Sequence, residues 1–155
     1  MLVPEPRWGV QLNGKTNATA RWTAQQSTEA LPWDEAPEYL IRDRDGCYGI
    51  EFRDRVESMG IEEVPTAPRS PWQNPYCERV IGSIRRECLD HVIVLNDRHL
   101  KRILSAYFDY YHNCRTHLSL ERNSPVPREV EPPSRGDVIS LPQVGGLHHR
   151  YTRAA

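Results

Sequence analysis

The stretch YLIRDRDGCYG, residues 39–49, decides the fold predicted for this chain. Its apolar start predicts a short buried strand over residues 38–42. Asp43 and Asp45 follow this strand directly, where the chain turns toward solvent. In one interpretation the two aspartates make a turn with Gly46, because aspartate is common in turns. In the other, Asp43 is a metal ligand and Asp45 is a turn residue.

Helices and strands are predicted to alternate along the rest of the chain. Capping residues at Thr19, Asn74 and Asp97, and apolar residues at helical spacing, predict the helices. The predicted elements are helices over residues 19–30, 52–60, 74–89 and 97–111, strands over 38–42 and 61–65, and an extended or β segment over 91–96. The last helix is expected to bury Leu100, Ile103, Leu104, Tyr107, Phe108 and Tyr111. Strands that alternate with helices predict an α/β fold.

The length of 155 residues suits one domain. Residues 17–130 carry the predicted elements, residues 1–16 are expected to form an irregular arm, and residues 131–155 a flexible tail rich in proline, glycine and charge. The four cysteines include no CxxC pair, and no signal peptide or membrane-length apolar run is visible. We therefore expect free thiols in a cytoplasmic protein.

Charge is unevenly distributed, although the net charge is only −1. Residues 29–63 hold eleven acidic residues and four arginines, whereas residues 69–122 hold nine basic and six acidic residues. This distribution suits a cation-dependent site beside a polyanion. A solvated surface would produce the same counts.

A second acidic residue, Glu78, lies in the first turn of the helix that Asn74-Pro75 opens, 35 residues after Asp43. Two carboxylates so placed can bind Mg²⁺, with water filling the remaining positions. Two such ions about 3.5–4 Å apart would stabilise the attacking and leaving oxygens in phosphoryl transfer. Taken alone, Glu78 would simply be favourable at a helix N-terminus.

Arginines near Glu78 are candidates for contact with phosphate. Gly82 and Arg85 share roughly the same helix face as Glu78. The candidate DNA-binding residues are Arg69, Arg79, Arg85, Arg86 and Arg115. The alternatives are a solvated face for the first four and, for Arg115 with His112 and His117, a polar cap on the last helix. Trp72 and Tyr76 are expected either to stack on a splayed base or to pack against the sheet.

Three segments together resemble the integrase catalytic core of bacterial insertion-sequence transposases. They are YLIRDRDGCYG, then GIEEVPTAPRSPWQNPYCERVIGSIRRECLDH, then YFDYYHNCRTHLSLERNSP, and the resemblance covers roughly residues 17–130. It implies a ribonuclease-H-like, retroviral-integrase-like fold and DDE chemistry, with Asp43 as the second acid and Glu78 as the third. It also implies DNA strand cleavage and strand transfer with two Mg²⁺ or Mn²⁺ ions, by direct attack of water or a 3′-hydroxyl.

The family pattern is incomplete, because residues 1–16 contain no aspartate. Asp34 is a weak substitute for the first acid, since it follows the wrong end of a helix. We therefore expect an N-terminally truncated core that lacks its first strands. The alternatives are a non-catalytic remnant that binds DNA or dimerises, and a ribonuclease-H-like nuclease unrelated to transposition. The expected partners are insertion-sequence ends, target DNA and a second copy or full-length transposase, with no membrane.

Overall fold

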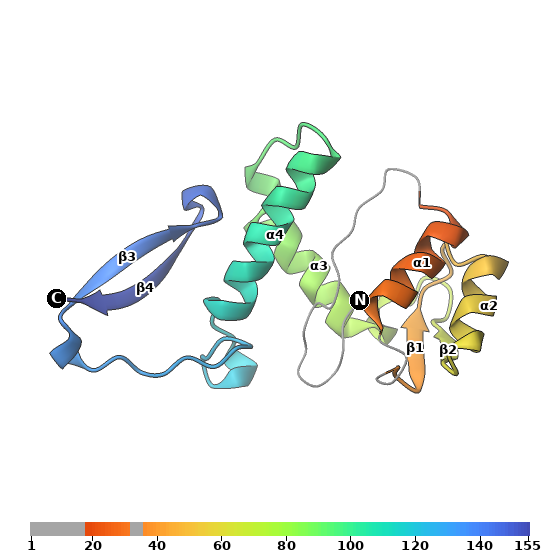
Figure 1. Ribbon diagram of the computed structural model, residues 1–155, viewed down its shortest axis with the longest axis horizontal. Helices are drawn as coiled ribbons and strands as arrows, with labels where there is room; N and C mark the ends of the chain where they lie inside the picture. The colour runs from red at the N-terminus through yellow and green to blue at the C-terminus, as the bar shows by residue number, and fades with distance from the viewer. Residues whose placement is uncertain (1–17, 32–35) are drawn as a thin grey trace. The chain divides into compact units, whose positions relative to one another are not determined.

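A computed structural model of the chain describes residues 18–31 and 36–155. It forms two compact units, which in this part of the chain are residues 18–82 and 83–155. Its helices and strands are α1 (Ala20–Ala30), β1 (Tyr39–Arg42), α2 (Ile50–Ser58), β2 (Glu62–Pro65), α3 (Pro75–Glu87), α4 (Asp97–Asn113), β3 (Asp137–Gln143) and β4 (His148–Ala154) (Figure 1). The mixed α/β class predicted from the sequence is confirmed at this level.

In the first unit, β1 and β2 pair in parallel, from Tyr39 opposite Glu62 to Arg42 opposite Pro65. A parallel pair needs a crossover connection, and α2 supplies it. Both strands lie where the sequence predicted them. Because parallel strands point the same way, the segments that follow β1 and β2 leave the sheet at the same edge.

Local capping explains where α1 begins and where α2 ends. Thr19 caps α1, since its hydroxyl oxygen accepts the backbone N–H of Trp22 at 3.3 Å. Gly60 follows α2 with a φ of +73°, a conformation that glycine adopts without steric cost. Both predictions are confirmed.

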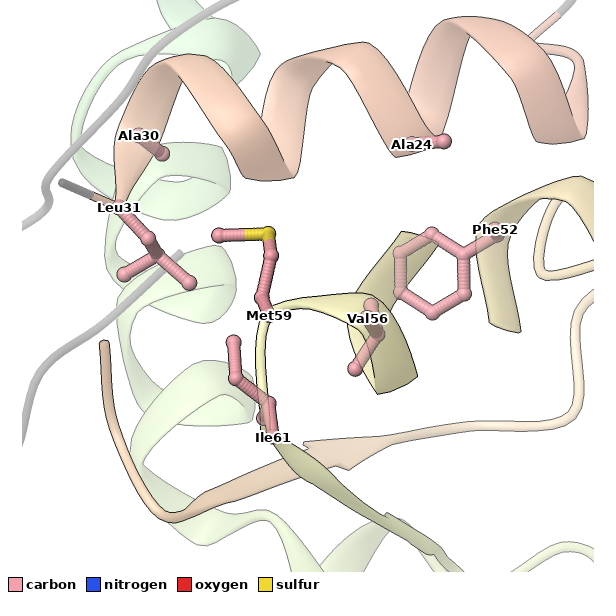
Figure 2. Packing of buried hydrophobic residues seen from close by; sticks show 7 residues of the cluster. All are labelled: Ala24, Ala30, Leu31, Phe52, Val56, Met59 and Ile61. Carbon is pink, nitrogen blue, oxygen red and sulfur yellow. The ribbon is translucent and has the colours of Figure 1, made fainter. Parts of the chain in front are cut away.

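The core of the first unit lies between the two helices. Phe52 and Val56 on α2 are almost completely buried, at 1% and 0% exposure. Figure 2 shows the cluster, which consists of Ala24, Ala30, Leu31, Phe52, Val56, Met59 and Ile61. Leu40 of β1 packs against this cluster, so one face of the sheet packs against the helices.

The prediction that residues 38–42 form a buried strand is wrong for one face of the sheet, which is exposed. Tyr39 is 51% exposed and Ile41 is 49% exposed, while Leu40 and Arg42 point toward the interior. Val64, the partner of Ile41 on β2, is 40% exposed. Successive side chains alternate between the two faces of a strand, and within the described residues of this unit the core covers one face only.

In the second unit, α4 buries Tyr107 and Tyr111, as predicted, and Cys88, the residue after α3, is fully buried. The other predicted core residues of α4 are only partly buried. The helix is capped by Asn96 and not by Asp97, because the Asn96 side chain accepts the backbone N–H of His99 at 2.9 Å while Asp97 is already helical. Residues 91–96 belong to no strand.

The C-terminal segment also corrects a prediction. Residues 131–155 were expected to lack regular structure, but β3 and β4 form an antiparallel hairpin from Asp137 opposite Ala154 to Gln143 opposite His148. Gly145 and Gly146 take positive φ in the connecting turn. Glycine and proline suggested disorder in the sequence, whereas here the two glycines make the turn.

Other predictions fall outside the described residues or stay open. The arm over residues 1–16 and the proposed substitute Asp34 lie outside the described ranges. No helix of residues 18–31 and 36–155 combines the length and apolar character needed to cross a membrane. The domain limits at residues 17 and 130, and the cytoplasmic location, stay predictions.

Candidate functional site

Asp43 lies at the exposed carboxyl end of β1, directly after Arg42. Its Oδ1 accepts the backbone N–H of Asp45 at 3.1 Å. The Asp45 carboxylate in turn accepts the N–H of Cys47 at 2.9 Å, a bond that lowers the pKa of Asp45. Asp45 is thus a turn residue, as expected. Asp43 contributes one oxygen to the same turn, and its other oxygen has no protein hydrogen bond within the described residues.

Two arginines, to which the sequence assigned no role, fix the backbone on either side of Asp43. Arg42 is buried, and its guanidinium binds Glu63 of β2 at 2.6 Å and donates to the carbonyl oxygen of Asp43 at 2.9 Å. Arg44 donates to the carbonyl oxygen of Thr66 at 2.9 Å. The turn that carries Asp43 is therefore tied to β2 and to the residue after it.

Glu78 lies in the first turn of α3 and is exposed, as the sequence predicted. Its backbone N–H donates to the carbonyl oxygen of Asn74 at 3.2 Å. Its carboxylate has no hydrogen-bond or ion-pair partner among the residues that the structure describes. A carboxylate at a helix N-terminus is electrostatically favourable, and this one is available to an external cation.

Tyr48 lies at the end of the turn that carries Asp43, and its backbone N–H donates to the carbonyl oxygen of Asp45 at 3.2 Å. Burial raises the pKa of Tyr48 to about 12, and the charges of Cys47, Asp43 and Cys77 contribute further. The Tyr48 ring itself packs edge-on against Phe52, with centroids 4.9 Å apart.

These two carboxylates suit a hard divalent cation. In the described residues, no group of three or more His, Cys, Asp or Glu side chains is arranged to hold a metal ion. Mg²⁺, however, is commonly bound through one or two carboxylates, with water and substrate phosphate completing an octahedron. Asp43 and Glu78 each have carboxylate oxygen available for such a role.

Four of the five candidate DNA-binding arginines are exposed. Arg79, Arg85 and Arg86 lie on α3, and Arg69 precedes it with a φ of +55°. Over the described ranges, none of these guanidinium groups pairs with a carboxylate. They are therefore accessible cations, as contact with phosphate requires, and DNA contact stays a prediction for each of them.

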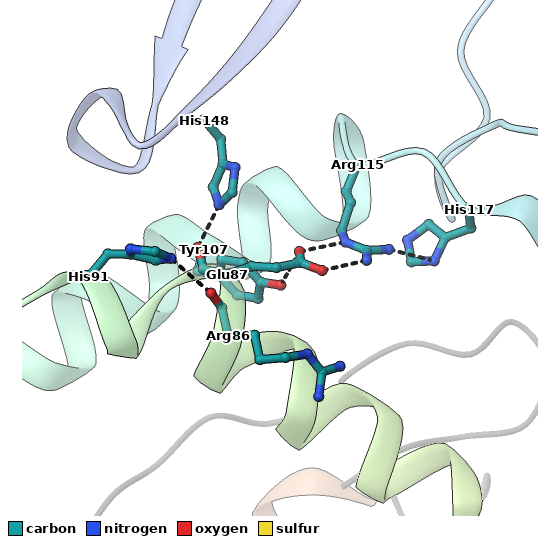
Figure 3. A network of polar contacts seen from close by, with 7 residues as sticks. All are labelled: Arg86, Glu87, His91, Tyr107, Arg115, His117 and His148. Atoms are coloured by element: carbon teal, nitrogen blue, oxygen red, sulfur yellow. Dashed lines mark hydrogen bonds and ion pairs between the residues drawn. The ribbon is translucent and has the colours of Figure 1, made fainter.

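Arg115 is placed differently (Figure 3). Its Nε and a terminal nitrogen bind the carboxylate of Glu87 at 2.7 and 2.6 Å, and its side chain is only 24% exposed. Tyr107 donates its hydroxyl proton to Glu87 at 2.9 Å, and His117 lies 3.2 Å from the guanidinium. The hydrogen bonds from Arg115 are the main reason that the pKa of Glu87 is lowered. This geometry favours the polar-cap interpretation of Arg115.

Two histidines bind backbone carbonyl oxygens at the C-terminal end of α3, a role that the sequence did not predict. A ring nitrogen of His91 lies 2.9 Å from the carbonyl oxygen of Arg86, and one of His148 lies 2.7 Å from that of Glu87 (Figure 3). The last carbonyl groups of a helix have no partner within the helix, so side chains often supply one. His148 lies 61 residues from Glu87, a separation at which the sequence carries no local signal.

Comparison with known families identifies part of the chain. Residues 59–125 match the family model described as an integrase core domain. No curated protein and no solved structure gives a significant match. The predicted resemblance to an integrase or transposase core is thus confirmed over a segment that contains Glu78 and all five candidate arginines.

Proposed function

We propose that this chain acts on DNA as a transposase core of the DDE type, by metal-dependent strand cleavage and strand transfer. The observation that carries the proposal is the pair of exposed carboxylates, Asp43 at the end of a parallel strand and Glu78 in the first turn of α3. The integrase core match over residues 59–125 supports the reaction class. The proposal includes a ribonuclease-H-like arrangement of the strands around these carboxylates.

Each residue has a distinct part in this function. Asp43 and Glu78 hold Mg²⁺ or Mn²⁺ through oxygen, with Asp43 oriented by its turn bond to Asp45. The bound cations supply Lewis acidity that activates a water or 3′-hydroxyl and stabilises the leaving oxygen. Arg79 and Arg85 meet the DNA backbone along α3, where guanidinium groups match phosphate geometry.

A second candidate function is a non-catalytic remnant that binds DNA or dimerises with a complete transposase. The absence of a three-residue metal cluster in the described part of the chain favours it. In this version the exposed arginines keep their contact with phosphate. The two carboxylates then bind a cation weakly, without chemistry.

One experiment separates the two candidates. The whole chain is incubated with supercoiled plasmid DNA and Mn²⁺, and nicking is followed on gels together with DNA binding. We expect Asp43→Asn and Glu78→Gln to abolish nicking, a loss greater than the about 10- to 100-fold that removal of a metal's outer-shell partner costs. Glu57→Gln, an exposed residue of α2, is the matched control and should remain fully active.

The outcomes differ clearly. Nicking by the parent chain that persists in Glu78→Gln would refute the assignment of Glu78. A parent chain that binds DNA but never nicks it, under any divalent cation, would establish the non-catalytic candidate. Joined rather than hydrolysed products, with a 3′-hydroxyl oligonucleotide present, would distinguish a transposase from a simple nuclease.

A further inference from the structure

Arg42 is the last residue of β1, and its side chain lies on the face of the sheet that packs against the helices. Its Nε and one terminal nitrogen both lie 2.6 Å from a single carboxylate oxygen of Glu63. The two side chains are 9% and 16% exposed. Because Glu63 is opposite Leu40 in the parallel pair, the ion pair joins β1 to β2 diagonally across this face.

The same guanidinium also contacts both ends of the turn that carries Asp43. Its other terminal nitrogen donates to the carbonyl oxygen of Asp43 at 2.9 Å. The centroid of the Tyr48 ring lies 5.4 Å from the guanidinium carbon, within the range of a cation–π contact. The backbone N–H of Tyr48 in turn donates to the carbonyl oxygen of Asp45. One side chain therefore links β2, the residue after β1 and the end of the turn.

The contacts of Arg42 fix geometry more than they add stability. A buried ion pair contributes little net stability, because the loss of hydration offsets the attraction between the charges. The hydrogen bonds of a guanidinium are directional, since its donors form a rigid planar fork. A carboxylate that holds a metal needs such fixed surroundings, and the neighbouring groups that supply them control metal affinity.

We propose that Arg42 is a positioning residue for Asp43, whose carboxylate it keeps in the orientation that binds a divalent cation. Its side chain is buried and its donors reach Glu63 and Asp43, so it acts through the backbone of Asp43 and not by contact with DNA. Glu63 balances its charge, which reduces the repulsion of a cation bound at Asp43. This role rests on the proposed function, in which Asp43 is a metal ligand.

The test measures the Mn²⁺ affinity of the full chain without DNA, from the electron paramagnetic resonance signal of the free ion. Arg42→Lys keeps a positive charge beside Glu63, but a single nitrogen cannot reproduce the planar fork that spans Glu63 and Asp43. Arg42→Gln combined with Glu63→Gln removes both charges, so that neither is left buried and unpaired. We expect each variant to weaken Mn²⁺ binding by about 10- to 100-fold, the usual cost of removing a group that orients a metal ligand.

Two controls separate positioning from a general loosening of the first unit. Val56→Ala removes methyl groups from a fully buried side chain of α2, so it should lower the urea midpoint and leave the bonds of the turn in place. Arg53→Gln removes an exposed arginine of α2 and controls for the change in charge. Both should bind Mn²⁺ as the parent does. Far-UV circular dichroism verifies that every variant is folded under the conditions of the titration.

Failure of this inference and failure of the proposed function give different results. If Asp43→Asn loses Mn²⁺ affinity but Arg42→Lys binds Mn²⁺ as the parent does, the inference is overturned while the proposed function stands. If the Arg42 variants and Val56→Ala lose affinity in proportion to their urea midpoints, Arg42 is only structural and the inference is again overturned. A parent chain that binds no Mn²⁺, or binds it equally well as Asp43→Asn, would overturn both.

Discussion

Replacing Glu87 by glutamine should destabilise the second unit. This change keeps the shape of the side chain but removes the charge that receives two hydrogen bonds from Arg115 and one from Tyr107. A glutamine amide keeps one acceptor oxygen and turns an N–H group toward the guanidinium. The variant therefore leaves Arg115 partly unpaired in a half-buried position.

The magnitude follows from how deeply the pair is buried. The Arg115 and Glu87 side chains are 24% and 28% exposed, so the pair lies between a fully buried and a fully exposed ion pair. Removing one partner of a fully buried pair costs about 3–5 kcal/mol, while an exposed pair contributes about 0–1 kcal/mol. We therefore expect Glu87→Gln to lower the free energy of unfolding by about 2 kcal/mol at neutral pH.

The effect should depend on pH in one direction. The pKa of folded Glu87 lies below its ordinary value of 4.5, chiefly because Arg115 binds the carboxylate. A depressed folded pKa contributes stability that is present above the unfolded pKa and lost as pH falls through the folded pKa. The difference between parent and Glu87→Gln should therefore be complete at pH 7 and shrink progressively below about pH 4.5.

Urea unfolding followed by far-UV circular dichroism, at several pH values, measures this difference. A double-mutant cycle with Arg115→Met isolates the pair, and its coupling energy should be about 1–2 kcal/mol. Tyr107→Phe removes only the hydrogen bond from the Tyr107 hydroxyl to Glu87 and should lower the free energy of unfolding by about 1 kcal/mol. Equal urea midpoints for the parent and Glu87→Gln at pH 7, or a difference that grows on acidification, would refute the reasoning.

The remaining predictions concern packing and backbone, and each is measured by urea unfolding. Phe52→Ala should cost about 3–4 kcal/mol, because its side chain is 1% exposed in the core of the first unit, whereas exposed Arg53→Ala should change little. Gly60→Ala should cost about 1 kcal/mol, since its φ of +73° is unfavourable for a residue with a Cβ; a neutral result would mean that the turn relaxes. Asn96→Ala should cost about 1 kcal/mol through loss of the α4 cap, and equal stability would show that another group replaces it.

Elements with local signals were predictable from the sequence. The cap at Thr19, the glycine at position 60 and the helix start at Pro75 each depend on residues a few positions apart, and the structure has all three as predicted. The placement of Asp43 after a strand and of Glu78 in the first turn of a helix was predictable for the same reason. That the two share a cation stays a prediction.

Elements that depend on distant partners were not predictable. Arg115 meets Glu87 from 28 residues away, so the sequence left both phosphate contact and a polar cap open for a side chain that the structure holds in an ion pair. The hairpin is held by Thr152 against Glu131, 21 residues apart, while its own composition suggested disorder. The exposure of Ile41 depends on which elements cover the sheet, and a four-residue strand carries no information about that.

The two cysteines of the first unit, Cys47 and Cys77, allow the separation between the Asp43 turn and the Glu78 helix start to be measured. Cys47 ends the turn that begins at Asp43, and Cys77 directly precedes Glu78; both are half-buried, whereas Cys88 is fully enclosed. Once Cys114 is changed to serine, paramagnetic labels attached to Cys47 and Cys77 would report the distance between the turn after β1 and the start of α3 in solution. Burial raises the pKa of the Cys47 thiol, so its labelling calls for mildly alkaline buffer. If Mn²⁺ binds between the two labels, adding it to such a sample would broaden the spectra of both labels at once.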